Sequence, residues 1–112
     1  ITLRPDTGLL GGLWEFPGGK IQAGETASQA CLREINEEVN LRIEISDHLL
    51  QVKHTYSHFK VILEIFLCRY RSGRIRLKGP VDYRWILPSQ LDEFPFPAAN
   101  HKFFQKLKRI MK

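Results

Sequence analysis

The sequence has few cysteines, no long apolar run and no internal repeat, and each of these shortages excludes a class of protein. Its two cysteines, Cys31 and Cys68, lie in apolar contexts without a CxxC or other metal-ligand spacing. We therefore expect buried free thiols, not a zinc site or a disulfide framework. No apolar stretch approaches the roughly 20 residues that a membrane-spanning helix needs. No signal-peptide pattern opens the chain, which favours a cytoplasmic protein without a membrane partner.

The composition that remains is that of one globular domain. A chain of 112 residues is long enough for a single core but not for two. Hydrophobic residues make up 43% of the chain and charged residues 26%, both ordinary values. The net charge of +5 points to a polyanionic partner, a nucleotide or a nucleic acid. A basic cluster near the C-terminus also fits an ordinary solvated helix end; it consists of Lys102, Lys106, Lys108, Arg109 and Lys112.

The most informative segment runs from residue 19 to residue 41, where a glycine-rich turn leads into a helix-forming stretch. Thr26 is a candidate N-cap, and Gln29 three residues later completes a capping-box pattern. Asn40 suits the left-handed position just past a helix end. Between them an apolar stripe recurs at a spacing of four, which predicts a helix with one buried face: Ala27, Cys31, Ile35 and Val39.

Carboxylates crowd the other side of this predicted helix. Glu34, Glu37 and Glu38 lie three and four residues apart and share one sector, with Glu25 close by at the opening turn. Arg33 is spaced to form an ion pair with Glu37. Clustered carboxylates repel one another unless a cation lies among them, and Mg²⁺ or Mn²⁺ prefers such oxygen ligands. The alternative is an ordinary amphipathic helix with a solvated acidic face.

The complete spacing of this segment resembles the Nudix box, G-x5-E-x7-R-E-U-x-E-E-x-G-U with U aliphatic. Only the late glycine differs, and Asn40 in its place tolerates the same left-handed backbone. The resemblance implies the Nudix fold, an α/β/α sandwich with a mixed β-sheet, with residues 1–112 as a single domain and the box at 19–41. Nudix domains usually carry another strand before this point, so we expect the N-terminal strand to be truncated.

The resemblance also implies roles for residues of the box. Glu34, Glu37 and Glu38 would ligate the metal, and one of them, or a carboxylate elsewhere, would act as general base. Arg33 would orient a carboxylate through a bidentate pair. Gly19 would let the backbone approach metal and phosphates, with its carbonyl as a further ligand.

Three more residues are candidates for the site. Asp82 is the candidate for a further metal-binding acid from a later part of the chain, as some relatives recruit one. Lys20 and Glu25, inside the motif, are candidates for substrate binding. Glu15, before the Pro-Gly-Gly turn, is interpreted as structural.

The resemblance extends to two branches of the family. The segments 11–20 (GGLWEFPGGK) and 94–100 (FPFPAAN) are similar to MutT-type hydrolases of 8-oxo-dGTP and to the C-terminal, 8-oxoguanine-sensing domain of MutY adenine glycosylases. In MutT-type enzymes the matching asparagine contacts the oxidised guanine, which implies that role for Asn100, since an amide offers both a donor and an acceptor. The alternative is that Asn100 caps a helix over residues 101–111.

Residues 54–59 (HTYSHF) resemble the MutY loop in which a serine touches the lesion base, so Ser57 is a substrate-binding candidate. Similar segments occur in free-standing relatives, and turn chemistry at a strand junction explains the serine equally well.

Two functions follow. The leading hypothesis is an Mg²⁺-dependent Nudix hydrolase that cleaves 8-oxo-dGTP, a nucleoside triphosphate, to monophosphate and pyrophosphate. The alternative is a non-hydrolytic domain of a MutY-type adenine DNA glycosylase that reads 8-oxoguanine in DNA. The intact carboxylates favour hydrolysis, because a recognition domain has no need of a repulsive acidic cluster. The basic balance, the HTYSHF segment and the absence of an initial methionine favour the alternative.

Elsewhere the patterns of alternation predict short strands and a terminal helix. Ser72-Gly73 reads as a hairpin turn and Pro88–Leu91 as a short helical turn. An apolar face marks the terminal helix, formed by Phe103, Phe104, Leu107 and Ile110. The predicted strands are 1–4, 13–16, 42–45, 48–56, 60–70, 74–77 and 81–87.

Overall fold

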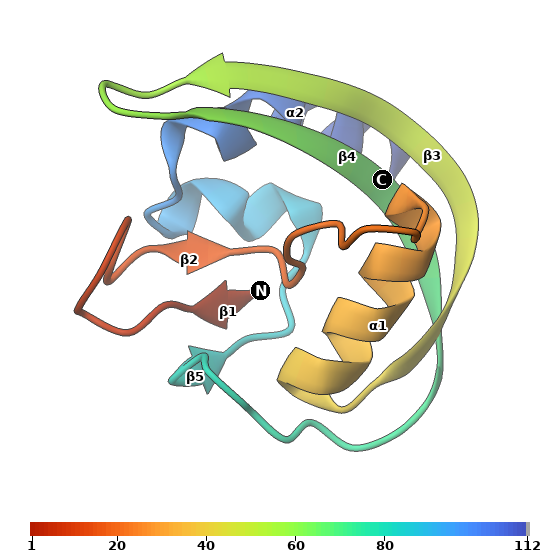
Figure 1. Cartoon of the computed structure of the whole chain (residues 1–112). Coiled ribbons are helices and arrows are strands. Elements are labelled where there is room, and N and C mark those ends of the chain that lie inside the picture. The colour runs from red at the N-terminus through yellow and green to blue at the C-terminus, as the bar shows by residue number, and fades with distance from the viewer. Residues whose placement is uncertain (112) are drawn as a thin grey trace.

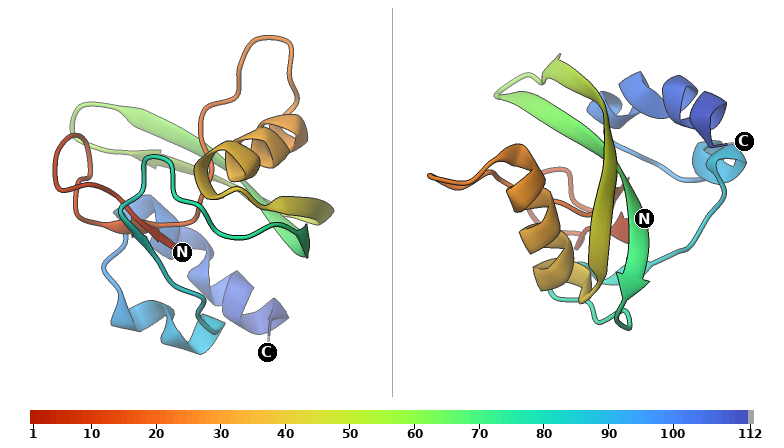
Figure 2. Two further views of the ribbon diagram at one scale, coloured as in Figure 1. Left: turned by 90° about the horizontal axis from the view of Figure 1, so that it is seen from below. Right: turned by 90° about the vertical axis from the view of Figure 1, so that its right-hand side faces the viewer.

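The structure, a computed structural model, describes residues 1–111 and consists of two antiparallel sheets and two main helices (Figure 1). A long hairpin forms one sheet, and three short strands form the other in the order β2-β1-β5. The helices α1 and α2 lie on opposite faces of the hairpin, as the right panel of Figure 2 shows. The elements in chain order are β1 (Thr2–Leu3), β2 (Trp14–Glu15), α1 (Ala27–Val39), β3 (Arg42–Thr55), β4 (Lys60–Ser72), β5 (Asp82–Tyr83), the 3₁₀ helix η1 (Pro88–Glu93) and α2 (Ala98–Ile110).

The expected α/β architecture is confirmed, but the sheet differs from the expectation. Every strand pairing among residues 1–111 is antiparallel, and the strands form two sheets in place of one mixed sheet. Strand β1 pairs on both of its edges, because Thr2 lies opposite both Glu15 and Tyr83. Its hydrogen bonds therefore stay within the small sheet. No helix among residues 1–111 combines the length and the apolar character needed to cross a membrane.

The two strands predicted at 42–45 and 48–56 are one continuous strand, β3. Its register against β4 shifts between Ile45 and Asp47 and again between His48 and Leu50. β-bulges of this kind absorb an extra residue without ending a strand. Ser46, at the shift between Ile45 and Asp47, donates its hydroxyl to the Leu67 carbonyl at 3.0 Å and keeps the strands together there.

The return strand predicted at 74–77 is wrong. This segment packs against the C-terminal end of α1, where the Arg76 N–H donates to the Val39 carbonyl at 3.1 Å and the Lys78 N–H to the Glu38 carbonyl at 2.8 Å. The last carbonyls of a helix lack partners within the helix, and these amides supply them. The strand predicted at 81–87 shortens to β5, whereas the helical turn predicted from Pro88 is confirmed as η1.

The main core gathers around α2 and includes the end of β2. Phe16, just before the Pro-Gly-Gly turn, stacks on Phe96 with ring centroids 5.7 Å apart and meets Phe103 edge-on at 5.2 Å. This aromatic contact links the turn that leads to α1 with the start of α2. The buried members of the core are Trp14, Leu49, Val52, Leu91, Phe96, Phe103, Phe104 and Leu107.

Lysines of the basic cluster make internal contacts. Lys102 donates to the Lys53 carbonyl at 2.9 Å, and Lys106 donates to the Leu49 carbonyl at 2.6 Å. Lys108 pairs with Asp92 at 2.7 Å. These lysines hold α2 against β3 and η1. They therefore contribute to the fold whether or not a polyanion binds.

Candidate functional site

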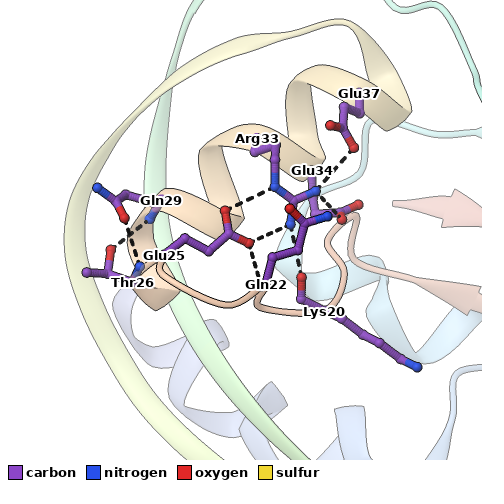
Figure 3. Close-up of polar contacts among 8 residues, drawn as sticks. All are labelled: Lys20, Gln22, Glu25, Thr26, Gln29, Arg33, Glu34 and Glu37. Atoms are coloured by element: carbon purple, nitrogen blue, oxygen red, sulfur yellow. Dashed lines mark hydrogen bonds and ion pairs between the residues drawn. The ribbon is translucent and has the colours of Figure 1, made fainter.

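Helix α1 is capped at both ends as its sequence predicts. The Gln29 N–H donates to the Thr26 hydroxyl at 3.1 Å, and the Thr26 N–H donates to the Gln29 side-chain oxygen at 2.8 Å (Figure 3). Asn40 has a φ of 61°, the left-handed conformation that ends the helix. The caps fix where the helix begins and ends, and therefore which residues face the turn at 17–20.

Arg33 is the centre of the polar cluster on α1. Its Nε and Nη2 donate to the two oxygens of Glu25 at 3.1 and 2.6 Å, a bidentate pair. Its Nη1 donates to Glu34 at 2.7 Å and to Glu37 at 3.2 Å, which confirms the expected pair between Arg33 and Glu37. Nη2 also reaches the Lys20 carbonyl at 3.0 Å (Figure 3). The Arg33 guanidinium thus joins helix α1 to Glu25, just ahead of the helix, and to the backbone at Lys20.

Glu25 and Lys20 take part in this cluster in different ways. Both oxygens of Glu25 are used by Arg33, and one also accepts the Gln22 N–H at 2.7 Å. The hydrogen bonds from Arg33 and Gln22 lower the pKa of Glu25. Lys20 contributes its carbonyl, while its exposed side chain extends away from Arg33 (Figure 3). Glu25 therefore positions Arg33. Of these two residues, Lys20 is the one whose charged group is free to contact a ligand.

Gly19 lies directly against the Glu34 carboxylate. A Cβ built on Gly19 would lie 2.6 and 2.7 Å from the two Glu34 oxygens, closer than such atoms approach in proteins. Gly19 does not have a positive φ, so glycine is required here for space and not for backbone conformation. The same geometry brings the backbone of the turn close to one carboxylate of the box.

Glu38 has a different environment from the other carboxylates of the box. It accepts the Gly18 N–H at 3.1 Å and is half-buried. Burial raises the pKa of Glu38 to about 7, the charges of Glu15 and Glu34 act in the same direction, and Gly18 and Arg4 oppose them. A carboxyl group with this pKa binds a proton near neutrality unless a cation replaces it.

Glu15 is the residue whose importance the sequence did not reveal. Interpreted there as structural, it does pair with Arg4 at 2.8 Å. Its charge also acts on Glu38, so it contributes to the electrostatics of the site. Strand alternation in the sequence already indicates that Glu15 points to the face opposite the buried Trp14, away from the core.

The donor atoms of this site suit a hard divalent cation, although they are not gathered around one. Among residues 1–111, no three or more His, Cys, Asp or Glu side chains are arranged to hold a metal ion. Arg33 donates hydrogen bonds to Glu34 and Glu37. Of the three carboxylates at 34, 37 and 38, Glu38 is the one to which Arg33 does not donate. The chemistry nevertheless fits, because carboxylate oxygens are the preferred ligands of Mg²⁺ and the charges of Glu15 and Glu34 act on the half-buried Glu38.

Asp82 is not brought to the other candidates. It lies on β5, which pairs with β1 on the opposite side from β2. Its Oδ1 accepts the Tyr83 N–H at 2.7 Å and pairs with Arg84 at 2.9 Å. The structure therefore places Asp82 at the far edge of the small sheet.

Asn100 lies in the first turn of α2, beside the turn that joins β3 and β4. It is not the helix cap, because α2 begins at Ala98 with Pro97 as its N-cap residue, so that alternative is wrong. Its side-chain oxygen is buried without a hydrogen-bond partner in the part of the chain that the structure describes. The Ala99 N–H donates to the Tyr56 hydroxyl at 3.1 Å, which brings the turn against the helix. Ser57, in that turn, is exposed.

The fold and the Arg33 cluster define the class of protein: residues 1–106 match the NUDIX domain family, and the chain belongs to it. An 8-oxo-dGTP diphosphatase of Buchnera aphidicola is 35% identical over 99 residues, covering 88% of this chain and 75% of that protein. A MutT protein of Methanosarcina mazei has a TM-score of 0.85 at 27% identity, covering 99% of this chain and 83% of that one. An adenine DNA glycosylase of Rattus norvegicus is 35% identical over 107 residues, covering 94% of this chain but 21% of the glycosylase.

Proposed function

We propose that this chain is a Nudix pyrophosphohydrolase that cleaves 8-oxo-dGTP to the monophosphate and pyrophosphate. The observation that carries the proposal is the Arg33 cluster, in which one guanidinium holds Glu25, Glu34 and Glu37 while Glu34 lies against Gly19. The similarity to a protein named 8-oxo-dGTP diphosphatase supports this choice of substrate. We further propose that residues 1–112 act as one domain and that the enzyme works in the cytoplasm, on the nucleotide pool.

Nudix hydrolases generally need a divalent metal ion, and we propose Mg²⁺ or Mn²⁺ for this one. The residues that would hold it are Glu34, Glu37 and Glu38, with the carbonyl of Gly19. A bound cation supplies charge neutralisation for the phosphates and lowers the pKa of the attacking water. Because Gly19 has no side chain, the Glu34 carboxylate can lie directly against the backbone of the turn.

The carboxylates of the site have two kinds of task in this proposal. Glu25 acts on the reaction through Arg33 and is a positioning residue, because both of its oxygens are already bonded. Arg33 in turn fixes the orientation of Glu34 and Glu37. One of the three box carboxylates accepts the proton of the attacking water.

Asn100 is proposed to read the base. The oxidised purine carries an N7–H donor where guanine carries the N7 acceptor. The buried amide oxygen of Asn100 has no partner among residues 1–111 and would accept from such a donor. Asn100→Ala should then reduce the preference for 8-oxo-dGTP over dGTP about 10-fold, since an unpaired buried polar group costs ~1–3 kcal/mol. Equal loss of activity on both nucleotides would contradict this role.

The test of the proposed function is pyrophosphate release from 8-oxo-dGTP in the presence of Mg²⁺. Glu34→Gln, Glu37→Gln and Glu38→Gln should each lower the rate at least ~100-fold, the scale of losing a general base or charge stabilisation. Glu44→Gln is the matched control, because Glu44 lies exposed on β3 and pairs only with Arg71 in the described contacts. The proposal fails if the unmodified chain releases no pyrophosphate.

A second candidate function is recognition of 8-oxoguanine in DNA as part of an adenine DNA glycosylase. It is favoured by the similarity to the glycosylase of Rattus norvegicus and by the exposed turn that presents Ser57 beside the start of α2. Tight binding to a duplex containing 8-oxoguanine, lost in Ser57→Ala and without pyrophosphate release, would favour this function over hydrolysis. The hydrolase predicts weak binding to DNA that falls steeply with salt.

A further inference from the structure

Two thiols meet where α1 packs against β4. Cys31 belongs to the second turn of α1 and Cys68 to β4, and both are free and half-buried. They line the same cavity of about 280 Å³, whose walls are mostly apolar and include Ile35, Phe66 and Tyr70. Neither thiol takes part in the proposed hydrolysis, so the pair stands apart from the site described above.

The two thiols are chemically unequal. They lie close enough for the Cys68 thiol to hydrogen-bond to the sulfur of Cys31. This hydrogen bond lowers the pKa of the Cys31 thiol, while the same contact and burial raise the pKa of Cys68. A thiolate attacks peroxides and disulfides where a thiol does not, so Cys31 is the nucleophile of the pair. Cys68 is the neighbour placed to react with whatever forms on Cys31.

We propose that Cys31 and Cys68 are a peroxide-reactive pair that closes into an intramolecular disulfide joining α1 to β4. The proposal rests on the contact of the two sulfurs and on their shared cavity, which a molecule as small as hydrogen peroxide can enter. It does not depend on the proposed hydrolase activity. It also corrects the sequence-based expectation in one respect, because both thiols are only half-buried.

The reaction balances in two steps. The Cys31 thiolate attacks one oxygen of hydrogen peroxide, the S–O bond forms, the O–O bond breaks and hydroxide leaves, which oxidises this sulfur to a sulfenic acid. The Cys68 sulfur then attacks the Cys31 sulfur; the S–S bond forms and the S–O bond breaks. The departing hydroxide takes the Cys68 proton and leaves as water. The hydroxide of the first step becomes water with the proton that Cys31 released on ionising. Two thiols have then lost their hydrogens, and one peroxide has become two waters.

The experiment is oxidation of the reduced, metal-free chain with a small excess of hydrogen peroxide, followed by intact mass and thiol titration. The wild type should lose two hydrogens and both thiols while remaining monomeric on a non-reducing gel. Cys68→Ser should stop at the sulfenic acid, trapped by a dimedone adduct on Cys31. Cys31→Ser should react at least ~10-fold more slowly, because the remaining thiol is mostly protonated.

Other results would overturn the proposal. These are retention of both thiols in the wild type, gain of oxygen without loss of hydrogen, or disulfide-linked dimers in place of the internal bond. Equal rates for Cys31→Ser and Cys68→Ser would contradict the assignment of the nucleophile. If a serine variant does not fold, judged by circular dichroism, the alanine variant at the same position replaces it. The wild-type mass change decides the central point without any variant.

Discussion

Glu25 and Glu38 are the same residue type at two ends of one polar site, and their environments are opposite. Glu25 has both oxygens hydrogen-bonded by Arg33 and Gln22, and these bonds lower its pKa. Glu38 accepts one backbone N–H, from Gly18, and burial raises its pKa to about 7. A carboxylate with both oxygens hydrogen-bonded, such as Glu25, supports the structure. A half-buried carboxylate with few hydrogen bonds and other negative charges nearby, such as Glu38, is available to bind a cation or a proton.

The largest effect should separate these two carboxylates in catalysis. Glu38→Gln should lower the rate of pyrophosphate release at least ~100-fold, because it removes a charge that would act on the metal and phosphates. Glu25→Gln should lower it only about 10-fold, because it disturbs the position of Arg33 without touching the reacting groups. The measurement is kcat for both variants with 8-oxo-dGTP and Mg²⁺. Equal losses would mean that the two carboxylates do not differ in role.

A smaller effect concerns the close approach between the turn and α1. Gly19→Ala should lower kcat/KM about 10-fold, because the new methyl group collides with the Glu34 carboxylate and moves it. The melting temperature should hardly change, since the colliding group is the end of a flexible side chain. Gly18→Ala is the matched control: its Cβ would meet nothing within 4 Å, and its N–H to Glu38 is retained. If both alanine variants behave alike, Gly19 is not required for space.

The smallest effect is on stability as a function of pH, and the two carboxylates should give opposite slopes. The raised pKa of Glu38 means that the folded state binds its proton more tightly than the unfolded state. Its cost to stability therefore grows as the pH rises from 4.5 through about 7 and then stays constant. Glu38→Gln should gain stability relative to wild type across this range, on the order of 1 kcal/mol after allowing for its partial exposure.

Glu25 should behave in the reverse way. Its pKa is lowered in the folded state, so its contribution to stability is present above its ordinary pKa of 4.5 and is lost as the pH falls through the folded pKa. Glu25→Gln should accordingly be least stable relative to wild type at neutral pH, and the difference should shrink in acid. Thermal melts from acid to neutral pH, compared for both variants, check the two slopes. Parallel curves would remove the distinction drawn between the sites.

The sequence predicted the local features of the site well. The capping box at Thr26, the left-handed Asn40 and the pair between Arg33 and Glu37 depend on residues within one helix, where spacing alone determines which groups meet. The charge of Glu15 on Glu38 and the contact between Tyr56 and Ala99 could not be read from spacing. They join segments that are distant in the chain, and their geometry depends on how the sheets and helices pack.

The errors in the predicted strands have the same cause. Residues 74–77 alternate as a strand would, but the amides of Arg76 and the following Lys78 donate to carbonyls at the end of α1 instead. Residues 42–55 contain a polar interruption that looks like a break, yet bulges let the strand continue. Tertiary partners decided both outcomes, and a single sequence does not reveal them.

The most direct test of the difference between Glu25 and Glu38 is the titration of their side-chain carboxyl carbons by NMR, in the chain labelled at glutamate and free of metal. We expect Glu38 to titrate near 7 and Glu25 below its ordinary value of 4.5. Addition of Mg²⁺ should shift the Glu38 midpoint to lower pH, because the cation competes with the proton, and should leave Glu25 unchanged. Titration of both carboxyls at the same ordinary pH, with no response to Mg²⁺, would contradict the account.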